Sequence, residues 1–176
     1  MDRILFKLML LILFGLPGAG KSFAGQLLQA EFGFTFHEAD EDIPDDYRQQ
    51  VLAGQVVGEP MRDAYHHHLL ERIAELHIDH PRLAVAAPLL RDRHRQWIHA
   101  RFPEAVFILV NCEQPAWESR LAARTHTISL AYAHKVASMN EPVTVPHILL
   151  DDSSDGQNGL RRQIAEILAQ RKMDRD

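Results

Sequence analysis

The segment at residues 15–22, GLPGAGKS, constrains the fold of this chain more than any other. It fits the pattern G-x-x-x-x-G-K-[ST], with Gly18 as an additional glycine inside it. Backbone N–H groups can wrap a phosphate closely only where side chains do not obstruct them, and a helix that starts there turns its positive end toward the anion. Lys21 then supplies a mobile cation, and the Ser22 hydroxyl can bind magnesium. The segment therefore predicts a phosphate-binding loop between a strand and a helix.

The residues on either side of this loop have the patterns that such a site needs. Residues 8–14 form an apolar run without alternation, which is typical of a parallel strand covered by helices on both faces. Because Arg3 and Lys7 precede this run, a secretory leader is the alternative, but the run is far shorter than the roughly 20 residues that span a bilayer. Residues 21–33 have the pattern of an amphipathic helix that ends near Gly33. This context favours a phosphate site over a leader or a plain glycine-rich turn.

The length and composition of the chain limit what else it can be. Its 176 residues, 46% of them hydrophobic, are enough for one globular domain with a full core. A formal net charge of -5 gives no reason to expect broad attraction to nucleic acid or to an anionic membrane. Cys112 is the only cysteine, which excludes an internal disulfide and fits a reducing cytoplasm. We expect a single-domain cytoplasmic protein, a monomer or homodimer, with neither nucleic acid nor membrane as a partner.

Apolar runs and amphipathic segments alternate along the rest of the chain. Further strands are expected within residues 34–40, 82–90, 105–112 and 147–152, and helices within residues 43–54, 59–77, 91–102, 115–124 and 159–172. This alternation predicts an α/β fold in which a five-stranded parallel sheet has helices on both faces. Ligands of such sheets gather at the carboxyl ends of the strands. The acids found at these ends are Glu38, Asp40, Glu113, Asp151 and Asp152.

Several segments resemble those of a known enzyme class. FHEADEDIP, AGQVVGEPMRD, ESRLAAR and MNEP, in this order, resemble the acid pair, the Gly-Glu-Pro helix and the lid flanks of P-loop small-metabolite kinases, gluconate kinase most closely and shikimate kinase next. The resemblance implies the P-loop NTPase fold, with a small helical acceptor region at about residues 44–77 and a lid at about 125–138. It also implies Mg²⁺-dependent transfer of the ATP γ-phosphoryl group to a hydroxyl of a small, usually anionic metabolite.

The resemblance and the loop pattern together give the expected nucleotide contacts. These are Gly15, Pro17, Gly18, Ala19, Gly20, Lys21, Ser22, Phe23, Arg120 and Arg124. Lys21 and Arg124 are also expected to act in catalysis, with Arg120 and Arg124 approaching the nucleotide from the base of the lid.

The same resemblance implies the metal contacts and the role of Asp40, and the positions of Arg62, His66 and Arg91 make them further candidates for the acceptor. Ser22 and Glu38 are expected to hold Mg²⁺, Glu38 through water. Asp40 is expected to be catalytic, because it would orient the acceptor hydroxyl and take its proton. The expected acceptor contacts are Asp40, Arg62, His66 and Arg91.

Each of these assignments has a plainer alternative. Glu38 and Asp40 could cap the helix that follows them. Arg120 and Arg124 could lie on a solvated helix face, and Arg91 could belong to a solvated helix start.

Two departures from the family pattern bear on function. The segment MRDAYHHH stands where gluconate kinase has an acidic run and an arginine, so the identity of the acceptor stays open. The lid segment between Arg124 and Lys135 contains no arginine or lysine, although such a lid usually brings a cation onto the transferring phosphate; His126 or Lys135 could substitute. The alternative function is therefore a nucleotide-binding or sensing protein with little or no kinase activity.

Overall fold

A single five-stranded parallel sheet organises the chain. The computed structural model describes residues 8–123, 128–152 and 156–173. The strands are β1 (Met9–Phe14), β2 (Thr35–Glu38), β3 (Arg82–Ala86), β4 (Val106–Asn111) and β5 (His147–Asp151), in the spatial order β2-β3-β1-β4-β5. Every neighbouring pair is parallel, and β1 lies in the centre between β3 and β4. The predicted α/β class and five-stranded parallel sheet are confirmed.

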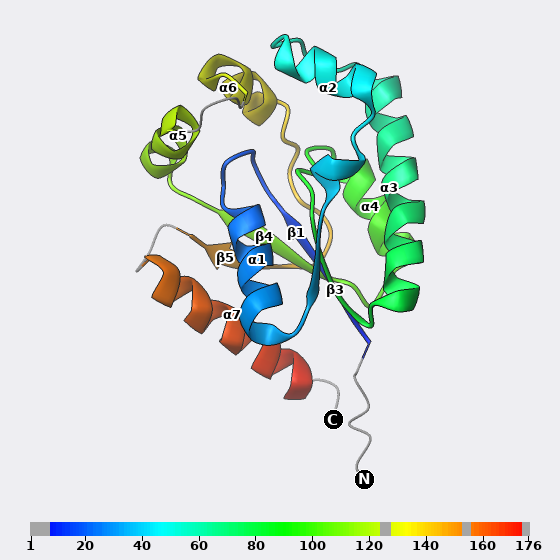
Figure 1. Cartoon of the computed structure of the whole chain (residues 1–176), viewed down its shortest axis with the longest axis vertical. Helices are drawn as coiled ribbons and strands as arrows, with labels where there is room; N and C mark the ends of the chain where they lie inside the picture. Colours follow the sequence, from blue (N-terminus) through cyan, green and yellow to red (C-terminus); the bar gives the residue numbers. More distant parts are fainter. Residues whose placement is uncertain (1–7, 124–127, 153–155, 174–176) are drawn as a thin grey trace.

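Helices connect the strands and cover the sheet on both faces (Figure 1). They are α1 (Lys21–Phe32), α2 (Asp45–Leu52), α3 (Glu59–Asp79), α4 (Asp92–Arg101), α5 (Gln114–Ala123), α6 (Leu130–Ser138) and α7 (Gly156–Met173). α1 and α7 lie against one face, and α3 and α4 lie against the other. α2, α5 and α6 stand above the carboxyl ends of the strands, around the loop that joins β1 to α1.

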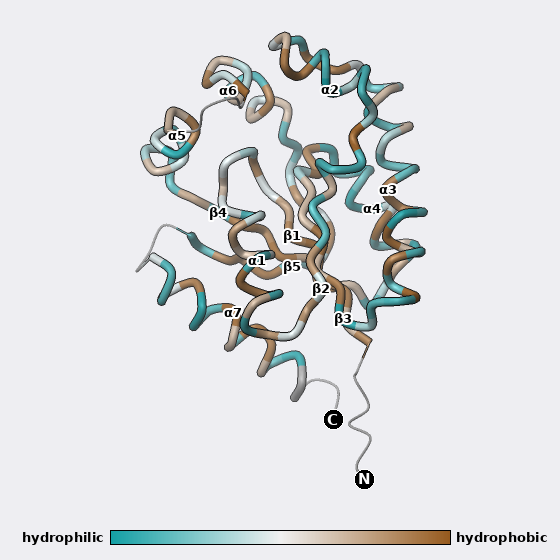
Figure 2. Tube along the Cα trace, in the orientation of Figure 1, coloured by the Kyte–Doolittle hydropathy of each residue, from teal (hydrophilic) through white to brown (hydrophobic). Residues whose placement is uncertain are grey.

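Strand β1 is buried on both faces because its alternate side chains enter different parts of the core. Leu11 and Leu13 pack with α1 and α7, whereas Ile12 and Phe14 pack with α3 and α4. Both faces of a central parallel strand are covered in this way, so its sequence is apolar without alternation. In Figure 2 the strands accordingly form a hydrophobic centre, and hydrophilic residues lie along the outer sides of the helices.

Three local features differ from the sequence expectations. The strand expected within residues 34–40 ends at Glu38 and continues as a 3₁₀ helix, Ala39–Asp42. The strand expected within residues 82–90 ends at Ala86, because Pro88 has no N–H to donate to a ladder and Leu89 adopts a positive φ of 43°. The lid region contains a helix, α6, that the sequence analysis did not separate; residues 125–127 of the expected lid lie outside the described part of the chain.

Within the described part of the chain, each helix is too short or too polar to traverse a lipid bilayer.

Helix α1 approaches strand β2 closely at Gly25. A Cβ atom at Gly25 would lie 2.1 Å from Cε2 of the Phe36 ring. Alanine normally favours a helix over glycine by about 1 kcal/mol, but this overlap adds the cost of overpacking, about 1–3 kcal/mol. We expect Gly25→Ala to lower the free energy of unfolding, measured by urea denaturation, and Phe36→Leu to recover part of the loss in the double variant. Additive losses in the double-mutant cycle would contradict this contact.

Candidate active site

The loop between β1 and α1 depends on glycines that other residues could not replace. Gly15 has a φ of 142°, and a Cβ atom there would lie 2.4 Å from the carbonyl oxygen of Val110. Gly20 caps α1 with a φ of 108°, in the left-handed region. A Cβ atom at Gly20 would lie 2.0 Å from Oδ2 of Asp152. Conformation and close approach therefore both require glycine at these two positions.

The start of α1 places several donors around this loop. The first helical hydrogen bond runs from the Ala24 amide to the Gly20 carbonyl, 2.9 Å. The amides of the first helical turn come before that bond, so they point out of the helix end where anions bind. The Nζ atom of Lys21 donates to the carbonyl oxygens of Gly15 and Leu16, at 3.0 and 2.8 Å. The loop thus concentrates positive charge beside its own backbone.

A cavity of about 340 Å³ brings the loop and the acids after β2 together. Its lining includes Lys21 and Ser22 from α1, together with Glu38 and Asp40 from the end of β2. Burial raises the pKa of the Glu38 carboxyl, and a hydrogen bond from the Ser22 hydroxyl opposes this shift. The structure therefore brings these four predicted site residues to one cavity.

A second cavity of about 130 Å³ continues from the first toward α3. Lys21 and Asp40 line both cavities, and Arg62 lines the second. Arg62 is only 5% exposed; its Nε donates to the Val57 carbonyl oxygen at 3.0 Å. Its Nη2 lies 4.0 Å from Sδ of Met139, just after α6. Arg62 thus occupies the inner end of the cleft that begins at the loop.

A third cavity of about 300 Å³ lies on the other side of the loop. Its lining residues are Gly18, Gly20, Phe23, Arg120, Asp152, Gly156 and Gln157. Nη1 of Arg120 donates to Oδ2 of Asp152 at 2.5 Å, and Nη2 donates to the Asp152 carbonyl oxygen at 3.1 Å. Arg120 therefore lies beside the loop, and its contact with a nucleotide stays a prediction, whereas Arg124 lies outside the described residues.

Sequence reasoning did not identify the partners that hold these residues. Asp152 was one of several acids at strand ends, with no sign that it orients Arg120 from 32 positions away. Trp117 also has a role that the sequence did not reveal, because its Nε1 donates to the Pro17 carbonyl oxygen and ties α5 to the loop. The available signal for Asp152 was its place at the end of β5, the strand next to β4.

His66 is placed differently from the acceptor contact expected of it. Its ring is 5% exposed and does not line either cavity at the loop. Nδ1 of His66 donates to the Arg62 carbonyl oxygen at 2.7 Å, and the ring stacks on His94 at a centroid distance of 3.7 Å. Burial lowers the pKa of His66 to about 3. The neutral ring therefore supports the helix that carries Arg62.

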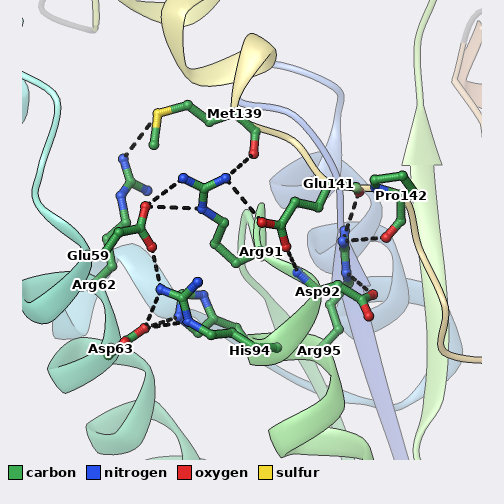
Figure 3. A network of polar contacts seen from close by, with 11 residues as sticks. Glu59, Arg62, Asp63, Arg91, Asp92, His94, Arg95, Met139, Glu141 and Pro142 are labelled. Atoms are coloured by element: carbon green, nitrogen blue, oxygen red, sulfur yellow. Dashed lines mark hydrogen bonds and ion pairs between the residues drawn. The ribbon is translucent and has the colours of Figure 1, made fainter.

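Arg91 also lies outside the lining of the two cavities that share Lys21 and Asp40, in an ionic network between elements (Figure 3). Its Nη2 donates to Oε1 of Glu59 at 2.6 Å, and its Nη1 donates to Oε1 of Glu141 at 3.2 Å. The same Nη1 donates to the Met139 carbonyl oxygen at 3.0 Å. The expectation that Arg91 meets an acceptor is thus corrected, because carboxylates of the protein already occupy its guanidinium. Arg91 instead joins the start of α3 to the segment after α6.

Comparisons with known proteins identify the fold. No family model and no curated protein matches the chain. An unliganded sugar kinase from Janibacter sp. HTCC2649 superimposes with a TM-score of 0.78 at 17% identity, covering 89% of this chain and 92% of that one. A gluconokinase from Sinorhizobium meliloti 1021 superimposes with a TM-score of 0.71 at 18% identity, covering 93% of this chain and 97% of that one. A shikimate kinase from Bacteroides thetaiotaomicron superimposes with a TM-score of 0.64 at 13% identity, covering 92% of this chain and 98% of that one. The chain therefore has the fold of P-loop small-metabolite kinases, as its motifs predicted.

The ionic network predicts a specific dependence of stability on pH. Hydrogen bonds from Arg91 and then Arg93 lower the pKa of Glu59 to about 2, from an ordinary value of 4.5. Folding thus favours the ionised Glu59 carboxylate. Its contribution to the free energy of unfolding is present above pH 4.5 and is lost as the pH falls toward about 2. We expect Glu59→Gln to lower the thermal midpoint near neutral pH, and the difference from wild type to vanish near pH 2.

The matched control is Glu75→Gln on the same helix. Glu75 is 68% exposed and makes one ion pair, 3.3 Å from Arg72. Exposed ion pairs of this kind contribute little to the free energy of unfolding, so Glu75→Gln should have the thermal midpoint of wild type at every pH. A Glu59→Gln difference that stays constant across the pH range would contradict ionic stabilisation by Glu59.

Proposed function

We propose that the protein is an ATP-dependent kinase that transfers the γ-phosphoryl group to a hydroxyl of a small anionic metabolite. One observation carries this proposal. The two cavities that share Lys21 and Asp40 form a path from the phosphate loop, past a carboxylate, to the buried Arg62. Such a path has a place for the phosphates, for a general base and for an anionic acceptor in the order that phosphoryl transfer requires.

The cavity beside Arg120 supports a nucleotide at the loop. It opens next to Gly18 and Gly20, on the side of the loop away from Asp40. A nucleotide whose base and ribose occupy this cavity would direct its terminal phosphate along the loop toward the acceptor side. Asp152 would hold Arg120 for contact with the phosphates.

The acids at the end of β2 support two separate roles. Asp40 is exposed at the junction of the two cavities, where a carboxylate can accept a proton from an attacking hydroxyl. Glu38 is half-buried next to the Ser22 hydroxyl. Lys21 would neutralise charge on the outer phosphates and so stabilise the transition state.

Ser22 and Glu38 fit a magnesium ion. Both offer oxygen atoms, the donors that Mg²⁺ prefers, and their hydrogen bond places them side by side. Among the residues that the structure describes, no cluster of three or more His, Cys, Asp or Glu side chains could hold an ion alone. This agrees with a metal that is completed by phosphate and water oxygens. Bound there, Mg²⁺ would neutralise negative charge on the phosphates.

Arg62 supports an anionic acceptor. In the described part of the chain no carboxylate forms an ion pair with it, although Glu59 and Asp63 belong to the same helix turn. Arg91 and Arg93 bind the oxygens of Glu59, and Arg93 and His94 bind Asp63 (Figure 3). A buried guanidinium without a counter-ion is costly, and an anionic ligand would compensate its charge.

A nucleotide sensor without efficient transfer is the second candidate. Lys135 is the only lysine or arginine within residues 128–138, and it is exposed on α6, outside the lining of the cavities around the loop. A lid of this kind supplies little charge to a transferring phosphate. The two candidates differ in whether acceptors stimulate the use of ATP.

Turnover with Mg²⁺-ATP and a panel of hydroxy acids, sugar acids and nucleosides tests the proposal. We expect at least one acceptor to stimulate ADP release and to become phosphorylated. Asp40→Asn should lower transfer about 100-fold or more, since general base catalysis contributes on this scale, while ATP affinity stays within about twofold. Glu41→Gln changes an exposed neighbouring acid outside both cavities and should leave transfer unchanged. Stimulation by none of the acceptors, with tight ATP binding, would favour the sensor.

The loop glycines give an independent prediction for nucleotide affinity. Gly20→Ala adds a Cβ atom that overlaps Asp152, whereas Gly54→Ala, at a φ of 70°, meets no atom within 4 Å. Both changes impose left-handed strain of about 1–2 kcal/mol on alanine, so they differ mainly in the clash. By isothermal titration calorimetry, Gly20→Ala should weaken ATP binding more than about tenfold, and Gly54→Ala should leave it unchanged. Equal affinities of the two variants would argue against nucleotide binding at this loop.

A further inference from the structure

We propose that the acceptor is a compact hydroxy-carboxylate with a mostly apolar carbon skeleton and few hydroxyl groups besides the one that is phosphorylated. This inference rests on the proposed kinase function and concerns the 130 Å³ cavity between Asp40 and Arg62, here called the acceptor cavity. Gluconate and shikimate, by contrast, carry several hydroxyl groups each.

The walls of the acceptor cavity are mostly apolar. Among the described residues, twelve line this cavity, and seven of them have no side-chain hydrogen-bonding group: Pro17, Ile43, Val51, Pro88, Leu90, Ile128 and Val136. The other five are Lys21, Asp40, Arg62 and two tyrosines, Tyr47 and Tyr132. Asparagine, glutamine, serine, threonine and histidine are all absent from the lining that the described residues form.

Four of the five polar residues in this lining have a task at one end of the cavity, and the Tyr47 hydroxyl is left as the one further side-chain partner that the described lining offers. Lys21 and Asp40 lie at the end shared with the phosphate loop, where the reacting hydroxyl would lie. Arg62 lies at the other end, and one guanidinium matches one planar carboxylate. The Tyr132 hydroxyl forms a hydrogen bond with Arg62, so it belongs to the carboxylate end as well.

The two tyrosines that line the cavity are themselves buried. Tyr47 is 7% exposed and Tyr132 is 5% exposed, and burial raises the pKa of both phenols. Tyr47 packs with Tyr65, whose own hydroxyl donates to the Ala39 carbonyl oxygen at 2.7 Å. A ligand between them would therefore meet rings and aliphatic groups along its middle.

Burial of a hydroxyl in such a cavity is unfavourable unless the wall offers a partner. Each hydroxyl that gives up water without a new hydrogen bond lowers affinity by about tenfold. Apolar carbon gains affinity from the same wall, because its transfer from water is favourable. The acceptor cavity therefore discriminates against polyhydroxylated acids and favours their deoxygenated counterparts.

Matched pairs of acceptors test this inference. We would measure kcat/KM with Mg²⁺-ATP for 6-hydroxyhexanoate against gluconate, for 4-hydroxybutanoate against threonate, and for 3-hydroxycyclohex-1-ene-1-carboxylate against shikimate. Within each pair the carboxylate and a terminal or ring hydroxyl are kept while the other hydroxyls are removed. We expect the deoxygenated acid of the best pair to be preferred by at least about tenfold, and hexane-1,6-diol, which has no carboxylate, to be a poor acceptor.

A wall substitution supplies a second measurement. Val136→Thr replaces a methyl group in the wall of the acceptor cavity by a hydroxyl and keeps nearly the same side-chain shape. The new hydroxyl offers a hydrogen-bond partner to a polyhydroxylated acid, so the kcat/KM ratio of the deoxygenated to the polyhydroxylated acid should fall by several-fold. Val143→Thr makes the same exchange at a half-buried position outside this cavity, so it should leave this kcat/KM ratio as in wild type.

The outcomes separate this inference from the proposed function. Transfer to gluconate, threonate or shikimate at least as efficient as to its deoxygenated partner would overturn the apolar-acceptor inference and leave the kinase proposal intact. Phosphorylation of none of the acids, despite ATP binding, would overturn the kinase proposal and this inference with it. If Val143→Thr altered the kcat/KM preference for the deoxygenated acid as much as Val136→Thr does, the wall of the acceptor cavity would not be what sets this preference.

Discussion

The structure depends first on the turn by which the chain leaves the buried strand β1 and enters α1. Gly15 must pass within contact of the Val110 carbonyl on β4, and Gly20 must adopt a left-handed conformation against Asp152. These two constraints fix the start of the helix at the carboxyl end of the central strand. The sheet order then brings the ends of β2 and β5 to either side of that helix end.

A second set of interactions joins the start of α3 to the segment that follows α6. Arg91 joins Glu59 at the start of α3 to Glu141 after α6, and the Glu141 amide donates to the Leu90 carbonyl oxygen at 2.9 Å. Arg62 lies one turn along α3 and reaches Met139 in the same segment. The buried Arg62 is therefore linked to the segment that follows α6. Movement of α6 would change the environment of Arg62 through these contacts.

The sequence predicts the elements and the loop well because both follow from local patterns. Apolar runs without alternation indicate buried parallel strands, and GLPGAGKS predicts a glycine-rich turn between a strand and a helix. Side-chain pairing is a tertiary property that these patterns do not encode. Arg91 was expected to meet the acceptor, and its actual partners Glu59 and Glu141, 32 and 50 positions away, could not be recognised from the sequence. The pairing of Arg120 with Asp152 was missed for the same reason, whereas the acids after β2 were found because strand ends converge.

The most direct test of the account is an NMR titration of ¹⁵N-labelled protein with Mg²⁺-ATP. If the loop holds the phosphates, the largest amide shifts will be those of Gly18, Gly20, Lys21 and Ser22, because their N–H groups would donate to the ligand. Resonances near Asp152 will follow at the same ATP concentrations. Loop amides that stay unshifted while ATP binds, with the changes gathered elsewhere, would contradict the phosphate-binding role on which the proposed function rests.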